Sequence, residues 1–506
     1  MNKSALQLYL DQNASKAHAG AASFYAALDQ VATVSPSISK AIAQELADQR
    51  SHLKLIASEN YCSLATQLAS ANLFTDKYAE GFAGHRFYAG CENVDTVESE
   101  ACQLACELFG AEHAYVQPHS GADANMVAFF AILSARVQAP LLETLNQSDL
   151  YKLSDKEWQN FRAQFNNQRL LALNYYAGGH LTHGYRHNVS SRLFQVSHYG
   201  VDSSTGLVDM DALAKQAKEV KPLVLLAGYS AYPRKLNFAK MRQIADDVGA
   251  VLMVDMAHFA GLVAGKVFTG DFDPVPHAHV VTSTTHKTLR GPRGGLVLCK
   301  NEFAEWVDKG CPAVLGGPLP HVMASKAIAF REALKPEFKT YAQSIVDNSQ
   351  ALAVSLKDEG IPVLTGGTDN HIVLVNVSEG FGLTGRQAET ALRECRLTLN
   401  RNSLPNDPNG AWYTSGLRLG TAAVSTIGMT ADDMKEIASI TKLVLSNTKA
   451  VIVAKGERKG QKSLAKYTLD ESVKKQAQER VAKLMELHRP YPELDLQILQ
   501  EAKLLS

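Results

Sequence analysis

The chain has 506 residues, and its 51 basic and 51 acidic side chains give a formal net charge of zero. That length is too great for one simple core and predicts two domains. A balanced charge excludes any electrostatic case for a protein that binds nucleic acid or anionic membranes. The seven cysteines match neither a disulfide framework nor a zinc-ligand spacing. We therefore expect no metal site and a reducing, cytoplasmic setting.

No targeting or membrane segment is expected. The first thirty residues lack a continuous apolar core and an early positive cluster. No later apolar run approaches the length of a membrane span, so we expect a soluble protein without a membrane partner.

From about residue 95 the sequence alternates between helix and strand patterns. Residues 96–110 repeat apolar side chains at helical spacing, and a short strand is expected at 114–118. Residues 237–250 are expected to form a crossover helix. Further apolar runs rich in Val and Leu lie at 193–199, 222–230, 251–255, 278–284 and 294–300. Such runs are typical of strands buried on both faces of a mostly parallel sheet, so the fold class is α/β.

A smaller domain is expected after about residue 335, where a long helix at 335–360 precedes a strand at 370–377. We divide the chain into an N-terminal helical arm (1–75), a large domain (76–335) and a small C-terminal domain with a helical tail (336–506). Two segments look added to this plan, and we expect both at the surface. They are residues 135–169, which are polar and helix-prone, and residues 455–506, which carry many charges and end in an amphipathic helix.

Residues just after the expected strands are the best candidates for chemistry, because parallel sheets bind ligands beyond the carboxyl ends of their strands. Asp255 ends one apolar run, where a carboxylate needs a cation or a strong donor. Lys287 follows the next strand, so the two side chains are expected to be neighbours. A desolvated amine close to Arg290 or Arg293 loses its proton more easily, as imine formation requires. A helix cap and a solvated loop lysine are the alternative interpretations.

Two further features suit anions. Ser120 and Gly121 stand at a turn before an apolar helix, where free backbone N–H groups can bind a phosphate, although Ser-Gly is also an ordinary cap. Arg418 can grip a carboxylate through two parallel hydrogen bonds, or form a structural salt bridge. An amine, a carboxylate, a phosphate site and a carboxylate clamp together describe pyridoxal phosphate bound to an amino acid.

Several long motifs, in the right order between about residues 40 and 445, resemble serine hydroxymethyltransferase. They are IASEN (56–60), DKYAEGFAGHRFYAGCENVD (76–95), GGHLTHG (178–184), VDMAHFAGLVAG (254–265), THKTLRGPRGG (285–295), GGTDNH (366–371) and NSLPNDP (402–408). The resemblance implies a fold-type-I enzyme that uses pyridoxal 5'-phosphate, with a mostly parallel large-domain sheet and a smaller α+β C-terminal domain. It implies reversible conversion of L-serine and glycine, with tetrahydrofolate as the one-carbon acceptor, in a homodimer with shared active sites.

The resemblance also implies roles for single residues. Lys287 would bind the cofactor as an imine, Asp255 would pair with its ring nitrogen, and His286 would influence reaction specificity. Tyr78 and Glu80 would come from the neighbouring subunit, with Glu80 as the acid-base group. The other cofactor contacts would be His180 on the ring face, His258 and Ser230 on the ring-oxygen side, Ser120 and Gly121 at the phosphate, and Gly316 and Gly317 at the phosphate in the partner subunit.

The remaining roles concern the two substrates. Ser58 and Arg418 would bind the carboxylate of the amino acid. The folate would contact Tyr175, Gly179, His180, Leu181, Asn402 and Trp412.

The chain departs from the family pattern at the phosphate and folate positions. Ala122 stands where a hydroxyl residue is usual, and Asp123 where an uncharged residue is usual. Tyr175 replaces an aliphatic residue, Phe87 lacks a tyrosine hydroxyl, and residues 410–412 replace a Ser-Pro-Phe-like stretch. Folate binding is therefore the part of the resemblance that these residues support least.

Two other functions stay open. A folate-independent racemase or 3-hydroxy amino acid aldolase of the same fold type would share Lys287 and Asp255, but it gives no reason for Glu80 in KYAEG. A non-catalytic scaffold or RNA-binding relative would tolerate loss of the lysine, which this chain retains.

Overall fold

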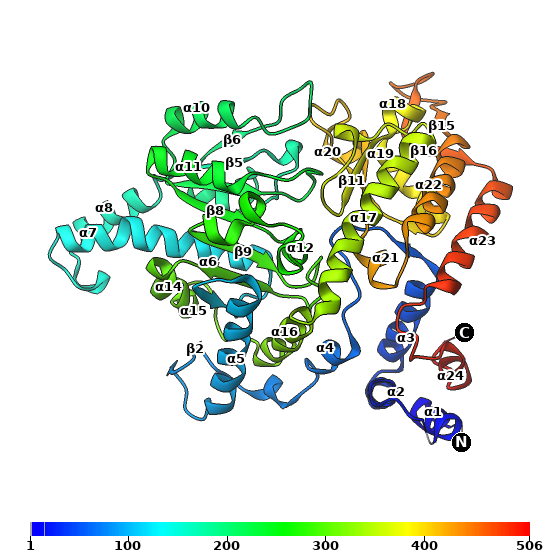
Figure 1. Ribbon diagram of the computed structural model, residues 1–506, viewed down its shortest axis with the longest axis horizontal. Helices are drawn as coiled ribbons and strands as arrows, with labels where there is room; N and C mark the ends of the chain where they lie inside the picture. The colour runs from blue at the N-terminus through cyan, green and yellow to red at the C-terminus, as the bar shows by residue number, and fades with distance from the viewer. Residues whose placement is uncertain (1–2, 15, 506) are drawn as a thin grey trace.

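A seven-stranded sheet forms the centre of the computed structural model, which describes residues 3–14 and 16–505 (Figure 1). In spatial order its strands are β4 (His113–Tyr115), β10 (Gly295–Cys299), β9 (Val280–Thr284), β8 (Val251–Asp255), β7 (Val224–Gly228), β5 (Arg169–Leu173) and β6 (Gln195–Tyr199). Strand β10 runs antiparallel to both of its neighbours, and the other pairs are parallel. The mostly parallel α/β sheet expected from the sequence is confirmed.

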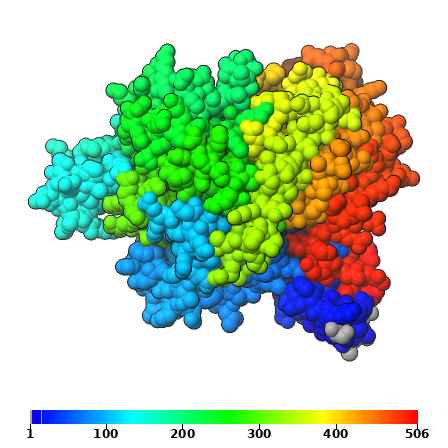
Figure 2. All heavy atoms as spheres, in the orientation of Figure 1, coloured from blue at the N-terminus to red at the C-terminus, as the bar shows by residue number. Residues whose placement is uncertain are grey.

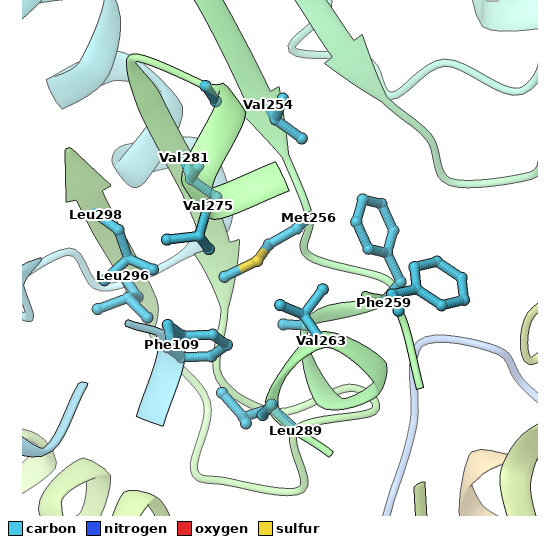
Figure 3. Packing of buried hydrophobic residues seen from close by; sticks show 14 of the residues in the cluster. Phe109, Val254, Met256, Phe259, Val263, Val275, Val281, Leu289, Leu296 and Leu298 are labelled. Atoms are coloured by element: carbon cyan, nitrogen blue, oxygen red, sulfur yellow. The ribbon is translucent and has the colours of Figure 1, made fainter. Parts of the chain in front are cut away.

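The apolar strands are buried because helices cover both faces of the sheet. In β8, Leu252 and Val254 belong to one hydrophobic cluster, while Val251 and Met253 belong to another on the opposite face. The first cluster is closed by α5 (Glu92–Phe109), α10 (Met210–Val220), α11 (Phe238–Val248), α12 (Ala260–Ala264) and α16 (Pro320–Ala333), and Figure 3 shows its centre. The second is closed by α6 (Gly121–Leu133), α8 (Asp155–Phe165) and α14 (Asn301–Asp308). Successive side chains of a strand point to opposite faces of the sheet. Because helices cover both faces, the side chains on both faces are apolar.

The segment 135–169 lies at the surface, as expected, and contains α7 (Ala139–Thr144) and α8, which project from the body of the molecule (Figures 1 and 2). Its end was not anticipated, because Arg169 begins strand β5. The four apolar residues that follow Arg169 are completely buried between β6 and β7. A run this short cannot be told from a helical segment by its periodicity.

One long helix corrects the expectation about membrane-spanning segments. It runs through α6, a π-helical turn at Ser134–Gln138 and α7. Its 24 residues, Gly121–Thr144, make it the one helix in the described part of the chain that is long and apolar enough to cross a membrane. However, 56% of its apolar window is buried, with Phe129 and Ile132 in the core. Packing against the sheet therefore accounts for its composition.

A second, smaller sheet with its own hydrophobic cluster follows α17 (Pro336–Asp358). Strands β11 (Ile372–Asn376), β14 (Gly416–Gly420) and β13 (Asn400–Asn402) form an antiparallel sheet in that order. It shares a separate hydrophobic cluster with α19 (Gly385–Glu394), α22 (Ala431–Ser446) and α23 (Glu471–Leu487). Leu53 joins this cluster because β1 (Leu53–Lys54) pairs with β12 (Leu397–Thr398).

The N-terminal helices pack against the end of the chain. Helices α1 (Ala5–Asn13), α2 (Ala19–Val34) and α3 (Pro36–Ser51) share a fourth hydrophobic cluster with α24 (Leu496–Glu501), and Figure 2 shows the blue N-terminal helices beside the red C-terminal segment. The three-part division of the chain remains a prediction. The other elements are α4 (Leu64–Leu68), β2 (Gly81–Phe82), β3 (His85–Arg86), α9 (Ser190–Leu193), α13 (Pro274–His277), α15 (Gly310–Ala313), α18 (Val377–Phe381), α20 (Gly410–Tyr413), α21 (Ala422–Thr426), β15 (Thr448–Ile452) and β16 (Lys462–Leu469).

Candidate active site

Asp255 and Lys287, the two residues expected to be neighbours, follow adjacent parallel strands. Asp255 is the last residue of β8, in register with Thr282 of β9. Lys287 follows β9 in the loop that leads to β10. Both side chains are buried, and both line a cavity of about 410 Å³. The pairing of β8 with β9 therefore brings the carboxylate and the amine to one site.

The environment of Lys287 favours its unprotonated form. Burial lowers the pKa of the amine from 10.5 to about 8; the charge of Asp255 opposes this shift, while Arg418 and Arg293 add to it. More of the amine is then free near neutral pH than for an exposed lysine, as attack on an aldehyde requires.

Only one of the two arginines named from the sequence lies at this cavity. Arg293 lines it. The guanidinium of Arg290 instead lies 4.3 Å from the centre of the Tyr341 ring and lines a different cavity. The expectation of a nearby arginine is thus met by Arg293 and not by Arg290.

Asp255 has a set of polar partners that the sequence analysis missed. Its carboxylate accepts hydrogen bonds from Asn125 Nδ2 at 2.9 Å and from the backbone N–H of Ala257 at 3.0 Å, and His183 Nε2 lies 3.1 Å away. Burial alone raises the pKa of Asp255, but His183, His180 and Asn125 together hold it below its ordinary value. Asp255 is therefore an anion at neutral pH, which is the state that a protonated ring nitrogen needs in its partner.

The sequence did contain a signal for these partners. His183 stands three residues after His180 in GGHLTHG, and Asn125 stands four residues after Gly121, on the same face of helix α6. Asn125 also accepts a hydrogen bond from Thr282 at 2.5 Å, so it ties α6 to both β8 and β9.

Three histidines with neutral rings line the cavity. Burial lowers the pKa of His180 to about 4 and that of His286 to about 3, and it brings the pKa of His258 well below its ordinary value. His258 Nδ1 lies 3.3 Å from Nε2 of His371, and the two rings stack with their centres 5.4 Å apart. Neutral imidazoles suit packing against a flat aromatic ring.

The start of helix α6 forms one end of the cavity. Ser120 is the N-cap, and its hydroxyl accepts a hydrogen bond from the backbone N–H of Asp123 at 3.1 Å. A Cβ on Gly121 would lie 2.7 Å from Thr284 Cγ2, so glycine permits the close approach of α6 to β9. The imidazole Nδ1 of His286 is buried without a hydrogen-bond partner. The free N–H groups at the start of α6 and the unpaired nitrogen of His286 therefore suit this end of the cavity to binding an anion.

Lys326 fixes the turn that leads into α6. Its side chain is buried, and Nζ donates hydrogen bonds to the carbonyl oxygens of Val116, Pro118 and Gly295 at 2.5, 2.9 and 2.9 Å. All three donors of the ammonium group are thus bonded to backbone. The lysine ties the turn after β4 to the beginning of β10.

Arg418 enters the cavity from the small sheet. Its Nε donates to Asn400 Oδ1 at 3.1 Å, and Nη1 donates to the backbone oxygen of Ser230 at 2.5 Å. Burial lowers the pKa of the guanidinium to about 10, which still leaves it charged at neutral pH. No carboxylate forms an ion pair with it in residues 3–14 and 16–505. The salt bridge considered from the sequence is therefore not formed, and Arg418 can receive a carboxylate ligand.

The structure brings most of the expected cofactor and amino-acid residues together in one place. The expected residues that line the cavity are Ser58, Ser120, Gly121, His180, Ser230, Asp255, His258, His286, Lys287 and Arg418. Four further lining residues had no expected role, namely Glu59, Tyr229, Ala257 and Thr284.

A second group of expected residues lies outside this lining. They are Tyr78, Glu80, Gly316 and Gly317. Gly317 lies beside Tyr78 instead, since a Cβ on Gly317 would lie 2.7 Å from the Tyr78 ring. The ring of Tyr78 is exposed and packs edge-on against that of Tyr88, with centres 4.9 Å apart. Within one chain these residues do not contribute to the cavity around Lys287.

The expected folate residues, apart from His180, also lie outside the lining. They are Tyr175, Gly179, Leu181, Asn402 and Trp412. The rings of Tyr175 and Tyr185 pack with their centres 5.0 Å apart. Trp412 is exposed, and the guanidinium of Arg401 lies 5.3 Å from the centre of its ring.

Comparison with known proteins gives the same family as the motifs. The family model described as "Serine hydroxymethyltransferase" matches residues 31–146 and 150–441. A serine hydroxymethyltransferase of Treponema pallidum (strain Nichols) is 58% identical over 98% of this chain and 86% of its own length. One from Mycolicibacterium smegmatis is 56% identical over 95% of this chain and 96% of its own length, and one from Chlamydia muridarum is 48% identical over 98% and 99%. The chain belongs to the serine hydroxymethyltransferase family.

Proposed function

We propose that this chain reversibly converts L-serine and tetrahydrofolate to glycine and 5,10-methylenetetrahydrofolate. Membership of the family supports this reaction. The observation that carries it within this chain is the buried amine of Lys287, which shares a cavity with the anionic carboxylate of Asp255 and the unpaired guanidinium of Arg418. The folate-independent racemase or aldolase is not favoured, because the family and these relatives carry the transferase name.

The cavity fits pyridoxal 5'-phosphate by the chemistry of its side chains. When bound, pyridoxal phosphate supplies a sink for the electron pair released as the bond between Cα and the hydroxymethyl carbon of serine breaks. We propose that the Lys287 amine binds the aldehyde carbon and that Asp255 holds a proton at the ring nitrogen. His286 Nδ1 and the N–H groups that begin α6 would hold the phosphate. Further cofactor contacts proposed are His180, His258, Ser230 and Ser120.

Arg418 and Ser58 would orient the amino acid. Two nitrogens of Arg418 are fixed by Asn400 and Ser230, which leaves Nη2 free for a carboxylate oxygen. Ser58 lines the same cavity and can donate its hydroxyl to the other oxygen. A carboxylate held in this way sets the position of Cα relative to Lys287.

We propose a homodimer, because the acid-base residue has to be supplied from elsewhere. Glu80 and Tyr78 lie outside the Lys287 cavity of their own chain, together with Gly316 and Gly317. In the proposed dimer, Glu80 of each chain would move the proton of the serine hydroxyl in the cavity of the other. The exposed aromatic side chains of Tyr78, Phe87 and Tyr88 would be covered by this contact.

The folate would enter between the two domains, beside His180. We propose contacts with Tyr175, Gly179, Leu181, Asn402 and Trp412, among which the exposed faces of Leu181 and Trp412 can pack on a flat ring. We place the reaction in the cytoplasm, with small molecules rather than nucleic acid or a membrane as partners. The seven free thiols in the described residues support a reducing compartment.

Spectra and rates test this function. Purified protein loaded with pyridoxal phosphate should show a visible absorption band, and Lys287→Ala should lose it. Lys300→Ala, which removes a surface lysine paired with Glu112, is the matched control and should keep the band. Serine cleavage by the loaded wild type should then accelerate about tenfold or more with tetrahydrofolate, because the folate captures the released carbon. A normal band without any folate stimulation would instead support the aldolase or racemase.

A further inference from the structure

A second cavity, of about 740 Å³, shares the lysine loop with the active site. Arg290 of that loop lines it, together with residues 61–64, Glu332, Lys335, Glu337, Phe338 and residues 426–428. Its remaining wall, residues 489–493, follows the last residue matched by the family model, residue 441. The cavity is therefore completed by a part of the chain outside the matched family region.

Residues 489–493, which form the outer wall of the cavity, are held in place by hydrogen bonds. Arg50 donates hydrogen bonds to the backbone oxygens of Pro490, Tyr491 and Leu494. Gln67 Nε2 donates to the Tyr491 hydroxyl at 2.7 Å. The wall is thus built by specific contacts, so the cavity is formed before any ligand arrives.

Two polar groups at the cavity lack partners. Tyr61 is 5% exposed, and its buried hydroxyl has no hydrogen-bond partner. The guanidinium of Arg290 lies over the rings of Tyr341 and Phe338, which pack edge-on against each other, at 4.3 and 5.6 Å from their centres. No carboxylate of the described residues lies within ion-pair distance of it. A buried donor without a partner costs free energy, so the Tyr61 hydroxyl marks a place for a ligand, and the half-buried Arg290 adds a cation to the same lining.

The charges at the cavity balance. Arg290, Lys335 and Arg489 oppose Glu332, Glu337 and Glu493. Glu332 is the partly buried acid, and it accepts a hydrogen bond from Ser63 at 2.8 Å. A lining with both signs of charge suits a ligand with one negative and one positive group, since each charge of the ligand then meets an opposite charge. The rings of Tyr61, Tyr491 and Phe338 offer packing for an apolar body.

We propose that this cavity is an effector site for a zwitterionic amino acid with a large apolar side chain. Arg290 binds its carboxylate, Glu332 binds its ammonium group, and the aromatic rings pack on its side chain. Pairing both charges inside a preformed pocket gives specificity for the complete amino acid.

Asn60 connects the effector site to the catalytic lysine. Its Nδ2 donates to the backbone oxygen of Lys287 at 2.9 Å, and its Oδ1 accepts from Thr426, a residue of the cavity wall, at 2.6 Å. The backbone N–H of Arg290 donates to the same Lys287 oxygen at 3.0 Å. A ligand that shifts Arg290 or Thr426 therefore changes the support of Lys287, and the coupling must be reciprocal.

Calorimetric titration of the cofactor-loaded protein with L-phenylalanine, in saturating glycine to fill the catalytic site, tests the proposal. Arg290→Gln and Glu332→Gln should each weaken binding about tenfold or more, which corresponds to ~1.4 kcal/mol. Arg489→Gln, a matched change at the rim, should alter it less than about twofold. The analogues 3-phenylpropanoate and 2-phenylethylamine, which each lack one charge, should bind at least about tenfold more weakly than phenylalanine.

Several results would overturn the site. Loss of binding in Arg418→Gln with full binding in Arg290→Gln would assign phenylalanine to the catalytic cavity, and undetectable binding to the wild type would remove the proposal. Thermal unfolding of each variant shows whether it is folded.

The coupling is tested separately by the dissociation constant of pyridoxal phosphate, which should change about fivefold with phenylalanine bound. An unchanged constant would exclude the effector role. These outcomes do not depend on folate, so they are distinguishable from failure of the proposed reaction.

Discussion

At the scale of single residues, burial sets the protonation states on which the site depends. The pKa of about 8 for Lys287 leads to a test of the apoprotein. Below that pH the amine is mostly protonated, so the rate of pyridoxal phosphate capture should rise about tenfold per pH unit and level off above pH 8. Stopped-flow absorbance between pH 6 and 10, on the order of one trace per half unit, measures this profile.

A variant at the neighbouring strand sharpens the test of Lys287. The carboxylate of Asp255 raises the pKa of the amine, so Asp255→Asn should move the midpoint of the rate profile to lower pH. A rate that keeps rising to the ordinary lysine pKa of 10.5 would show that Lys287 is not desolvated.

His371 should decide which nitrogen of His258 carries a hydrogen. The backbone oxygen of Ala57 can only accept, so Nε2 of His371, at 3.2 Å from it, is the donor nitrogen. The same Nε2 lies 3.3 Å from Nδ1 of His258, which therefore accepts and leaves its own Nε2 protonated. In His371→Leu we expect a mixture of His258 tautomers and cofactor binding weakened about tenfold, the equivalent of one hydrogen bond.

Nitrogen-15 NMR of the histidines, in protein without cofactor, measures the tautomer directly. His371→Gln keeps an N–H donor at nearly the same reach and should restore the wild-type signal. His187→Leu, a change at a histidine outside the cavity, is the control. A His258 signal that is the same in the Leu and wild-type proteins would contradict the assignment.

At the scale of elements, the sequence predicted what periodicity and strand order control. The runs at 251–255 and 278–284 can be paired from the sequence alone, because adjacent parallel strands place their carboxyl ends together. Strand order thus predicts Asp255 and Lys287 as neighbours. Asn125 could not be predicted, since a polar residue inside an otherwise apolar helix shows its purpose only when its partners are known. Strand β5 was missed because its run is short and follows a polar segment.

The C-terminal tail shows the same limit. Its amphipathic helix was expected and appears as α23. Strands β15 and β16 were not, because they pair with each other at the surface and carry mixed polar and apolar residues. The docking of α24 on α1 and α2 joins segments more than 450 residues apart, which no local pattern encodes.

Arg50 should hold this tail on the N-terminal helices. Its guanidinium binds three backbone oxygens between residues 490 and 494, so Arg50→Ala leaves them without a charged donor. We expect a loss of roughly 2–4 kcal/mol in the local stability of the tail. Limited proteolysis should then cut between α23 and α24 at a higher rate. Arg331→Ala, which removes an exposed ion pair with Glu100, is the control and should leave the cleavage rate unchanged.

At the scale of the whole molecule, the separation of Glu80 from the Lys287 cavity leads to a prediction about subunits. Lys287→Ala removes the amine, and Glu80→Gln removes the acid-base group, so each variant alone should be inactive. If the sites are shared, a mixed dimer holds one site with both defects and one site with neither. Random mixing of equal amounts makes half of the dimers mixed, and half of their sites are intact, so about 25% of wild-type activity should return.

Co-expression with two different affinity tags allows the mixed dimer itself to be purified, and its activity should then approach about half of the wild type. The double variant Lys287→Ala/Glu80→Gln paired with the wild type gives the opposite arrangement, in which each site has one defect and activity should be absent. Activity of that second mixed dimer, after the same purification, would mean that Glu80 serves the cavity of its own chain. The position of Glu80 outside the Lys287 cavity would then have to be explained by a movement within one chain rather than by a contact between two.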